Sequence, residues 1–151
     1  MASLRHLSRE LVLQTLFLYY FRNPEEVTPR EAFSYVLDEF GKHLIETDFA
    51  ESLYQGVVEH KAELDIIIQK YAPEWPVDKI APIDRIILEI GLFELIHTDV
   101  PPLVAINEAV EIAKTYGEEN TPKFVNGVLS SYAHDIIGKE NLQKPRNVRS
   151  N

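Results

Sequence analysis

Apolar residues at helical spacing, separated by prolines and a glycine, constrain the fold most strongly between residues 101 and 132. Pro101 and Pro102 are typical of a helix start, because the backbone N–H groups of the first turn make no hydrogen bond within the helix and the N–H that proline lacks is not needed there. The residues that follow give one apolar stripe, made of Val104, Ala109, Val110 and Ala113. Gly117 is expected to end this helix in the left-handed conformation. The segment therefore predicts a helix that ends in a short turn.

A second helix with its own start signals follows the turn. Thr121 is expected to cap it, with Pro122 in its first position. Its apolar stripe consists of Phe124, Val128, Leu129 and Tyr132. Lys123 lies in the first turn, where a cation opposes the helix dipole. We expect Asn126 to tie the two helices together, with Asn107 as its partner, because an amide near an apolar face needs a hydrogen bond.

Helical spacing also recurs through the rest of the chain, without a strand-and-turn pattern. The first helix is expected to contain Leu4 to Leu18. A capping box from Thr28 to Glu31 opens a second helix, which stops at Gly41. A long third helix is expected from Thr47 to about Tyr71. These signals predict an all-α fold of about six or seven helices.

A proline-rich segment at 73–82, with one short helical turn around 77–80, is the expected boundary between two parts of one domain. The helical subdomains would be about 1–72 and 82–138, with three helices in each. Gly138 is expected to end the last helix. Residues 139–151 form a polar tail that we expect to be disordered.

Composition and charge narrow the class of protein. The chain has 151 residues, 45% of them hydrophobic, and no cysteine. No apolar run approaches the ~20 residues of a membrane span and no signal-peptide pattern opens the chain, so we expect a cytoplasmic protein. The net charge of −9 argues against general polyanion binding, but residues 1–22 and 139–151 are both net basic. This distribution fits a protein that contacts phosphate at its basic ends. The alternative is that the acidic surface merely keeps the protein soluble.

Catalytic patterns are absent from the sequence. None of the five histidines lies three or four residues from another, so no helix presents a histidine pair to a metal. No phosphate-binding glycine loop or nucleophile motif occurs among the six glycines. We therefore expect neither an enzyme nor a protein that needs a metal or a cofactor.

Two blocks of sequence resemble the NusB family of transcription antitermination factors. Residues 104–114 read VAINEAVEIAK and residues 123–129 read KFVNGVL, at the spacing typical of that family. The start of the chain, SRELVLQTLF, and the segment IDRIILEIGLFEL are also similar to it. The resemblance covers all but about the last dozen residues. It implies two packed three-helix bundles and no enzymatic activity.

The resemblance also implies an RNA-binding surface. The residues at positions that correspond to it are Arg5, His6, Arg9, Lys123, Phe124 and Asn126. The alternatives are that the arginines are merely solvated and that Phe124 belongs to the core. RNA contact would come from phosphate pairing and from stacking of an unpaired base on the phenylalanine.

The family binds RNA as a heterodimer with the ribosomal protein NusE, which implies partner contacts at Phe17 and Asp84. One helix cannot bury all of the aromatic residues between Phe17 and Phe21 on one face, so we expect at least one exposed ring. The leading interpretation is an antitermination factor that binds a single-stranded boxA-type signal in ribosomal-RNA transcripts and links it, through NusE, to elongating RNA polymerase. The alternative is an RNA-recognition or protein-interaction module without antitermination activity. The sequence leaves a monomer and a homodimer equally open.

Overall fold

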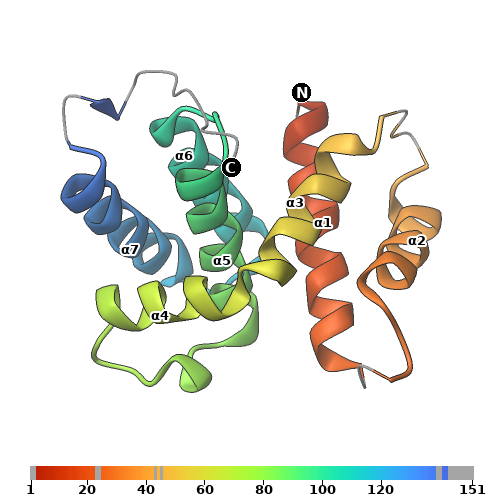
Figure 1. Ribbon diagram of the computed structural model, residues 1–151, viewed down its shortest axis with the longest axis horizontal. Helices are drawn as coiled ribbons and strands as arrows, with labels where there is room; N and C mark the ends of the chain where they lie inside the picture. The colour runs from red at the N-terminus through yellow and green to blue at the C-terminus, as the bar shows by residue number, and fades with distance from the viewer. Residues whose placement is uncertain (1–2, 23–24, 43, 45, 139–140, 143–151) are drawn as a thin grey trace. The chain divides into compact units, whose positions relative to one another are not determined.

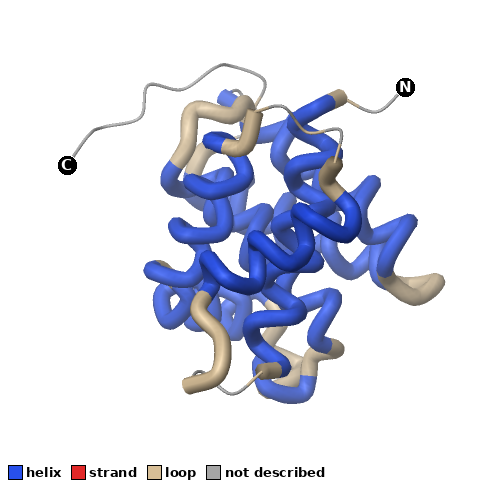
Figure 2. The backbone as a smooth tube through the Cα atoms, turned by 90° about the vertical axis from the view of Figure 1, so that its right-hand side faces the viewer, coloured by secondary structure: helices blue, strands red, loops and turns tan. Residues whose placement is uncertain are grey.

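The chain folds into helices joined by short loops. The structure is a computed structural model that describes residues 3–22, 25–42, 44, 46–138 and 141–142. Figure 2 shows no strand in this part of the chain, so the predicted all-α fold is confirmed. The elements are α1 (Leu4–Phe21), α2 (Pro29–Phe40), α3 (Asp48–Glu59), α4 (Lys61–Tyr71), the 3-10 turn η1 (Val77–Lys79), α5 (Pro82–His97), α6 (Pro102–Tyr116) and α7 (Thr121–Ile136) (Figure 1). None of the helices described here is long and apolar enough to span a membrane.

The helices form two compact units, residues 1–59 with α1 to α3 and residues 60–151 with α4 to α7. The division lies well before the proline-rich segment at which the sequence predicted it. Helix α4 packs against α5 and α7, and this assigns α4 to the second unit. The proline-rich segment is therefore a loop inside that unit and not a linker between subdomains.

The predicted long third helix is in fact two helices, because the backbone breaks at His60 with φ −107° and ψ 13°. Helix α3 buries Leu53 and Val57 in the first unit, whereas α4 buries Leu64 and Ile68 in the second. These four residues recur at continuous helical spacing, so the sequence pattern alone gave no sign that they serve different cores.

The first unit is a three-helix bundle in which α1 contacts both α2 and α3. Its core includes Leu11, Val36 and Leu44. The capping box is present as predicted: Glu31 N–H donates to Thr28 Oγ1 at 3.1 Å, and Thr28 N–H donates to Glu31 Oε1 at 3.3 Å. Helix α2 therefore begins and ends where the sequence indicated.

The second unit is built around α5, whose residues from Ile86 to Leu95 are all buried. Helices α6 and α7 both contact it, and Gly91 allows a close approach to Leu129 of α7. Val104 was predicted on the buried stripe of α6 but is 43% exposed, because Ala105 and Ile106 face the core instead.

Part of the predicted disordered tail is ordered. Leu142 is buried and its carbonyl accepts a hydrogen bond from Leu103 N at 3.1 Å. Residues 139–140 and 143–151 lie outside the described residues. Gly138 has φ 91° and follows the C-terminal end of α7, as expected for a left-handed helix end.

The turn between α6 and α7 differs in detail from the prediction. Gly117 has φ −95° and ψ −175°, which is extended backbone and not left-handed. A Cβ at Gly117 would lie 2.5 Å from Thr121 Cβ, so close packing explains the glycine. The N-cap of α7 is Asn120 rather than Thr121. The Thr121 hydroxyl instead accepts from Glu118 N–H at 2.9 Å, which stabilises the turn.

Candidate nucleic-acid interface

Two arginines of α1 share one aromatic ring in the first unit. Arg5 Cζ lies 4.6 Å from the centroid of the Phe49 ring, and Arg9 Cζ lies 5.1 Å from the same centroid. Both guanidinium groups thus face one side of α1, as their four-residue spacing predicted. Arg5 is exposed, but Arg9 is only 3% exposed. Arg5 therefore presents its charge to solvent, while Arg9 is enclosed against Phe49.

His6 lies between the two arginines and is half-buried. Its Nε2 is 3.7 Å from Glu10 Oε1, one helical turn away. Its backbone N–H donates to Ser3 Oγ at 3.0 Å, which caps α1. The neighbouring carboxylate weakens the attraction of this position for a phosphate, so Arg5 is the stronger candidate contact at this end of the chain.

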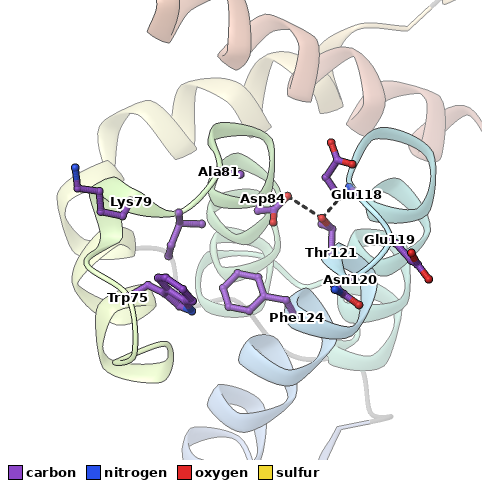
Figure 3. A pocket seen from close by; sticks show the side chains of 10 residues that line it. Trp75, Lys79, Ala81, Asp84, Glu118, Glu119, Asn120, Thr121 and Phe124 are labelled. Carbon is purple, nitrogen blue, oxygen red and sulfur yellow. Dashed lines mark hydrogen bonds between the residues drawn. The ribbon is translucent and has the colours of Figure 1, made fainter.

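The start of α7 borders a groove in the second unit. Two adjoining cavities of about 440 and 550 Å³ share Trp75, Asn120 and Phe124, and we call them together the α7 groove. Figure 3 shows the side chains of Trp75 and Phe124 directed into the space of the first cavity. Trp75 is 57% exposed and Phe124 is half-buried, so both have aromatic surface that a ligand can reach.

The side chain of Gln69 holds the backbone around Trp75 in place at the edge of the α7 groove. Its Nε2 donates to the Trp75 carbonyl at 2.7 Å, and its Oε1 accepts from Val77 N–H at 2.8 Å. One side chain of α4 thereby holds the backbone on both sides of Pro76. Trp75, which lines the groove, and Gln69, which holds the backbone beside it, were not among the candidate residues predicted from the sequence. A lone tryptophan in a proline-rich segment was the available signal, but the role of Gln69 depends on tertiary contacts.

Charge divides the α7 groove into two sides. The exposed Lys123 lines the second cavity, and Glu74 is the acidic residue among its lining side chains. The first cavity is bordered by Asp84, Glu118 and Glu119, with Lys79 as its cation. A phosphate is therefore favoured beside Lys123 and disfavoured at the acidic side.

Asp84 lies on the acidic side, in the first turn of α5. Its Oδ1 accepts a hydrogen bond from Thr121 Oγ1 at 3.0 Å, which joins the starts of α5 and α7 (Figure 3). Burial raises the pKa of Asp84 above its usual value; the Thr121 hydrogen bond counteracts the rise and Glu118 adds to it. The carboxylate thus has a structural role besides any contact with a partner.

Phe17 and Phe21 form an exposed aromatic pair on α1. Their ring centroids are 4.6 Å apart, and the two side chains are 37% and 61% exposed. This confirms the expectation that at least one ring of this cluster remains exposed. Aromatic residues are enriched in protein–protein interfaces, so this pair is a candidate surface for a protein partner.

Asn126 does not connect the two helices as expected. Its side chain is exposed, and its Oδ1 accepts from Ser130 Oγ at 3.3 Å on the same helix. Asn107, the predicted partner, is also exposed on α6. Both side chains are accessible to solvent, and Asn126 is therefore also accessible to a ligand.

Two other basic residues of the second unit, Lys61 and Arg85, pair with carboxylates of α4 and α5. Lys61 Nζ lies 2.7 Å from Asp65 Oδ2 and 3.1 Å from the fully buried Glu89, and Arg85 Nη2 lies 2.7 Å from Asp65 Oδ2. Burial, together with Asp65, raises the pKa of Glu89 to about 8. Burial alone would raise the pKa of Asp65, but hydrogen bonds from Glu89, Arg85 and Lys61 hold it at about 2. These cations are therefore committed to a structural cluster rather than to a phosphate.

Sequence comparison identifies the family. The NusB family matches residues 6–134 of the chain. The chain belongs to the NusB family. Relatives named transcription antitermination protein NusB include that of Bacillus pumilus, 42% identical over 134 residues that cover 87% of this chain and 96% of the relative. Another, from Nitratiruptor, is 39% identical over 132 residues that cover 87% of this chain and 93% of the relative. As a NusB antitermination factor, the chain belongs to a non-enzymatic class of proteins.

Solved NusB structures share the fold. NusB from T. maritima superposes with a TM-score of 0.73 at 32% identity, covering 95% of this chain and 96% of that one. A structure of the antitermination factors NusB and NusE in complex with double-stranded RNA matches with a TM-score of 0.74 at 30% identity, covering 87% of this chain and 96% of that one. The NusB-like all-α architecture predicted from the sequence is thereby confirmed.

Proposed function

We propose that this protein binds a single-stranded boxA-type signal in ribosomal-RNA transcripts together with NusE, and that the complex acts on elongating RNA polymerase. The similarity to a NusB that is solved with NusE and double-stranded RNA supports RNA and NusE as partners. The choice of a single strand rests on the aromatic surface of the α7 groove, since stacking on a protein ring requires an unpaired base.

The observation that carries the proposal is the combination of Lys123, Phe124 and Trp75 around one groove. A cation beside two accessible aromatic rings is the arrangement that single-stranded nucleic acids need, because the backbone is anionic and every base has a flat face. Phosphate binding at Lys123 also explains a lysine that opposes the dipole of α7. Asn126, exposed one turn further along, adds a donor and an acceptor for a base edge.

At the start of α1, the proposal assigns the phosphate contact to Arg5. Arg9, which is buried against Phe49, acts by holding that ring beneath Arg5. His6 faces Glu10 at 3.7 Å and therefore contributes less to this phosphate contact than Arg5 does. RNA affinity therefore depends on few cations, which makes help from a protein partner important.

NusE is proposed to contact the exposed Phe17–Phe21 pair and the acidic side of the α7 groove around Asp84. The aromatic pair supplies apolar area, and the carboxylates supply orientation through charge. If both partners bind one complex, each must raise the affinity of the protein for the other by the same factor.

The test uses Trp75 as a reporter, because it is the single tryptophan of the chain and lines the α7 groove. Titration with a single-stranded boxA-type RNA should quench its fluorescence through base stacking, and addition of tryptophan-free NusE should lower the apparent Kd. The same sequence locked in a duplex should bind more weakly. Phe124→Ala should reduce the affinity by roughly 5- to 150-fold, the range that corresponds to the ~1–3 kcal/mol of one base stack.

The matched control is Tyr35→Ala, which removes an exposed ring of α2 far from the α7 groove in sequence and should leave RNA binding unchanged. Equal affinity of the Phe124→Ala protein, or a preference for the duplex, would overturn the single-strand assignment. Normal RNA and NusE binding without antitermination in a reconstituted transcription reaction would favour the alternative, an interaction module without that activity.

A further inference from the structure

Two histidines and a glutamate that are far apart in the sequence meet where α4 begins and α5 ends. His60 precedes α4, Glu63 lies in the first turn of α4, and His97 is the last residue of α5. The imidazole centroids of His60 and His97 are 4.1 Å apart, and His97 Nε2 is 3.3 Å from Glu63 Oε1. One potential ligand atom from each of the three residues lies within 4.8 Å of the others.

We propose that His60, Glu63 and His97 bind a divalent transition-metal ion of the zinc class. Two imidazole nitrogens and one carboxylate oxygen are borderline donors that suit zinc, nickel or copper better than magnesium or calcium, which prefer oxygen ligands throughout. This site shares no residue with the α7 groove, and the proposal does not depend on the proposed RNA binding.

The spacing of the donors agrees with a tetrahedral ion. Bonds of about 2.0–2.2 Å from zinc to nitrogen and oxygen place tetrahedral ligand atoms roughly 3.4 Å from each other. The distance of 3.3 Å between His97 Nε2 and Glu63 Oε1 already has this length. All three donor atoms lie within 4.8 Å of one another, so the longest of these distances must shorten by up to about 1.4 Å when the ion binds, and three protein ligands leave a fourth position for water.

The surroundings hold both rings in place and favour a cation. Phe93 lies one turn before His97, with its ring centroid 5.2 Å from that of His97 and 5.6 Å from that of His60. This ring limits the rotation of both imidazoles. His97 is at the C-terminal end of α5, where the helix dipole is negative, and the Glu63 carboxylate adds one full negative charge.

A bound ion would fasten His60 to the end of α5. His60 is the residue at which α3 gives way to α4, and it is also the first residue of the second unit. Metal binding would therefore stabilise the start of the second unit, and the effect should appear in its thermal unfolding. Without a metal, the same three residues still form a ring stack and a histidine–carboxylate contact, and this is the competing explanation of the cluster.

The experiment uses the full chain without a histidine tag. Co²⁺ should produce visible absorption bands of a four-coordinate nitrogen–oxygen site, and Zn²⁺ should bleach them at one equivalent. At a zinc concentration about 100-fold above Kd, the stabilisation is about 2.7 kcal/mol, and the melting temperature of the second unit should rise by roughly 10–20 °C. Trp75 fluorescence reports this transition because the only tryptophan of the chain lies in that unit.

Two variants test the ligands against a matched control. His97→Ala and Glu63→Gln should each weaken Zn²⁺ binding, and loss of the histidine should do so by at least roughly 100-fold, since losing even an outer-shell partner costs about 10- to 100-fold. His134→Ala removes an exposed histidine in the last turn of α7 and should bind zinc as the parent does. Circular dichroism of the metal-free proteins checks that each variant is folded.

The absence of cobalt bands and of a zinc-dependent melting shift would overturn the proposal in favour of a simple stacking cluster. Equal weakening of zinc binding by His134→Ala and His97→Ala would also overturn it, because the binding would then be scattered over surface histidines. Single-equivalent binding that depends on His97 and Glu63 but not on His134 would support it.

Discussion

The contact between Gly91 and Leu129 offers a sharp test of how the second unit is packed. A Cβ at Gly91 would lie 2.7 Å from Leu129 Cδ1 and 3.5 Å from the Ala109 Cβ. Leu129 is fully buried, so its side chain has little room to move away. We expect the Gly91→Ala change to destabilise the protein although alanine is the better helix former.

The magnitudes follow from two opposing effects. The overlap with Leu129 costs about 1–3 kcal/mol, as is typical of overpacking, while the replacement of a mid-helix glycine recovers about 0.5–1 kcal/mol. The net cost of Gly91→Ala should therefore lie between about 0 and 2.5 kcal/mol, with a central value of about 1 kcal/mol. Leu129→Ala alone leaves a cavity and should cost about 2–5 kcal/mol. In the double variant the new methyl group enters that cavity, so the double variant should be about 1 kcal/mol more stable than Leu129→Ala.

Urea unfolding followed by Trp75 fluorescence measures these free energies in the unit concerned. Gly127→Ala is the matched control, because Gly127 lies mid-helix in α7 and its Cβ would meet no atom within 4 Å. That variant should gain about 0.5–1 kcal/mol. Additive effects in the double variant, or a stabilised Gly91→Ala protein, would refute the proposed contact between α5 and α7.

Three further changes test charge and turn geometry. The pKa of Glu89 is about 8 in the folded protein, against an ordinary value of 4.5, so the folded state keeps a proton that the unfolded state loses. The free energy of unfolding should therefore fall as the pH rises from about 4.5 to about 8. In urea titrations Glu89→Gln should flatten this dependence, whereas the control Glu111→Gln, at an exposed residue, should not. Lys123→Ala should leave the stability of the protein unchanged or slightly higher, because the lysine opposes the helix dipole. In RNA titrations it should lower the slope of log affinity against log salt by about 0.7. A destabilised variant with normal RNA binding would contradict the assignment of Lys123 as a phosphate contact. Gly117→Ala should lower the melting temperature, because the added Cβ would lie 2.5 Å from Thr121 Cβ. An unchanged melting curve would show that the turn can shift to make room for the methyl group.

The sequence determined most of the secondary structure, because its signals are local. A capping box, a proline in a first turn and an apolar stripe each act within about ten residues, so α1, α2 and the helices after residue 82 begin and end close to their predicted positions. The two family blocks also pointed to Lys123 and Phe124 as candidate residues, and the structure places both side chains at the α7 groove.

Tertiary structure decided which side chains are buried and which meet. Arg9 and Arg5 look alike in the sequence, yet only the fold encloses Arg9 against Phe49. The break at His60 was hidden because α3 and α4 continue one apolar spacing while they pack into different cores.

The histidine cluster shows the same limit of sequence reasoning. A spacing rule within one helix excluded a histidine pair, but α4 and α5 bring together His60 and His97, which are 37 positions apart. Likewise, Gln69 orients Trp75 through hydrogen bonds across a bend in the backbone. Helix boundaries depend on neighbours in sequence, whereas burial and site geometry depend on neighbours in space, which only the packed chain supplies.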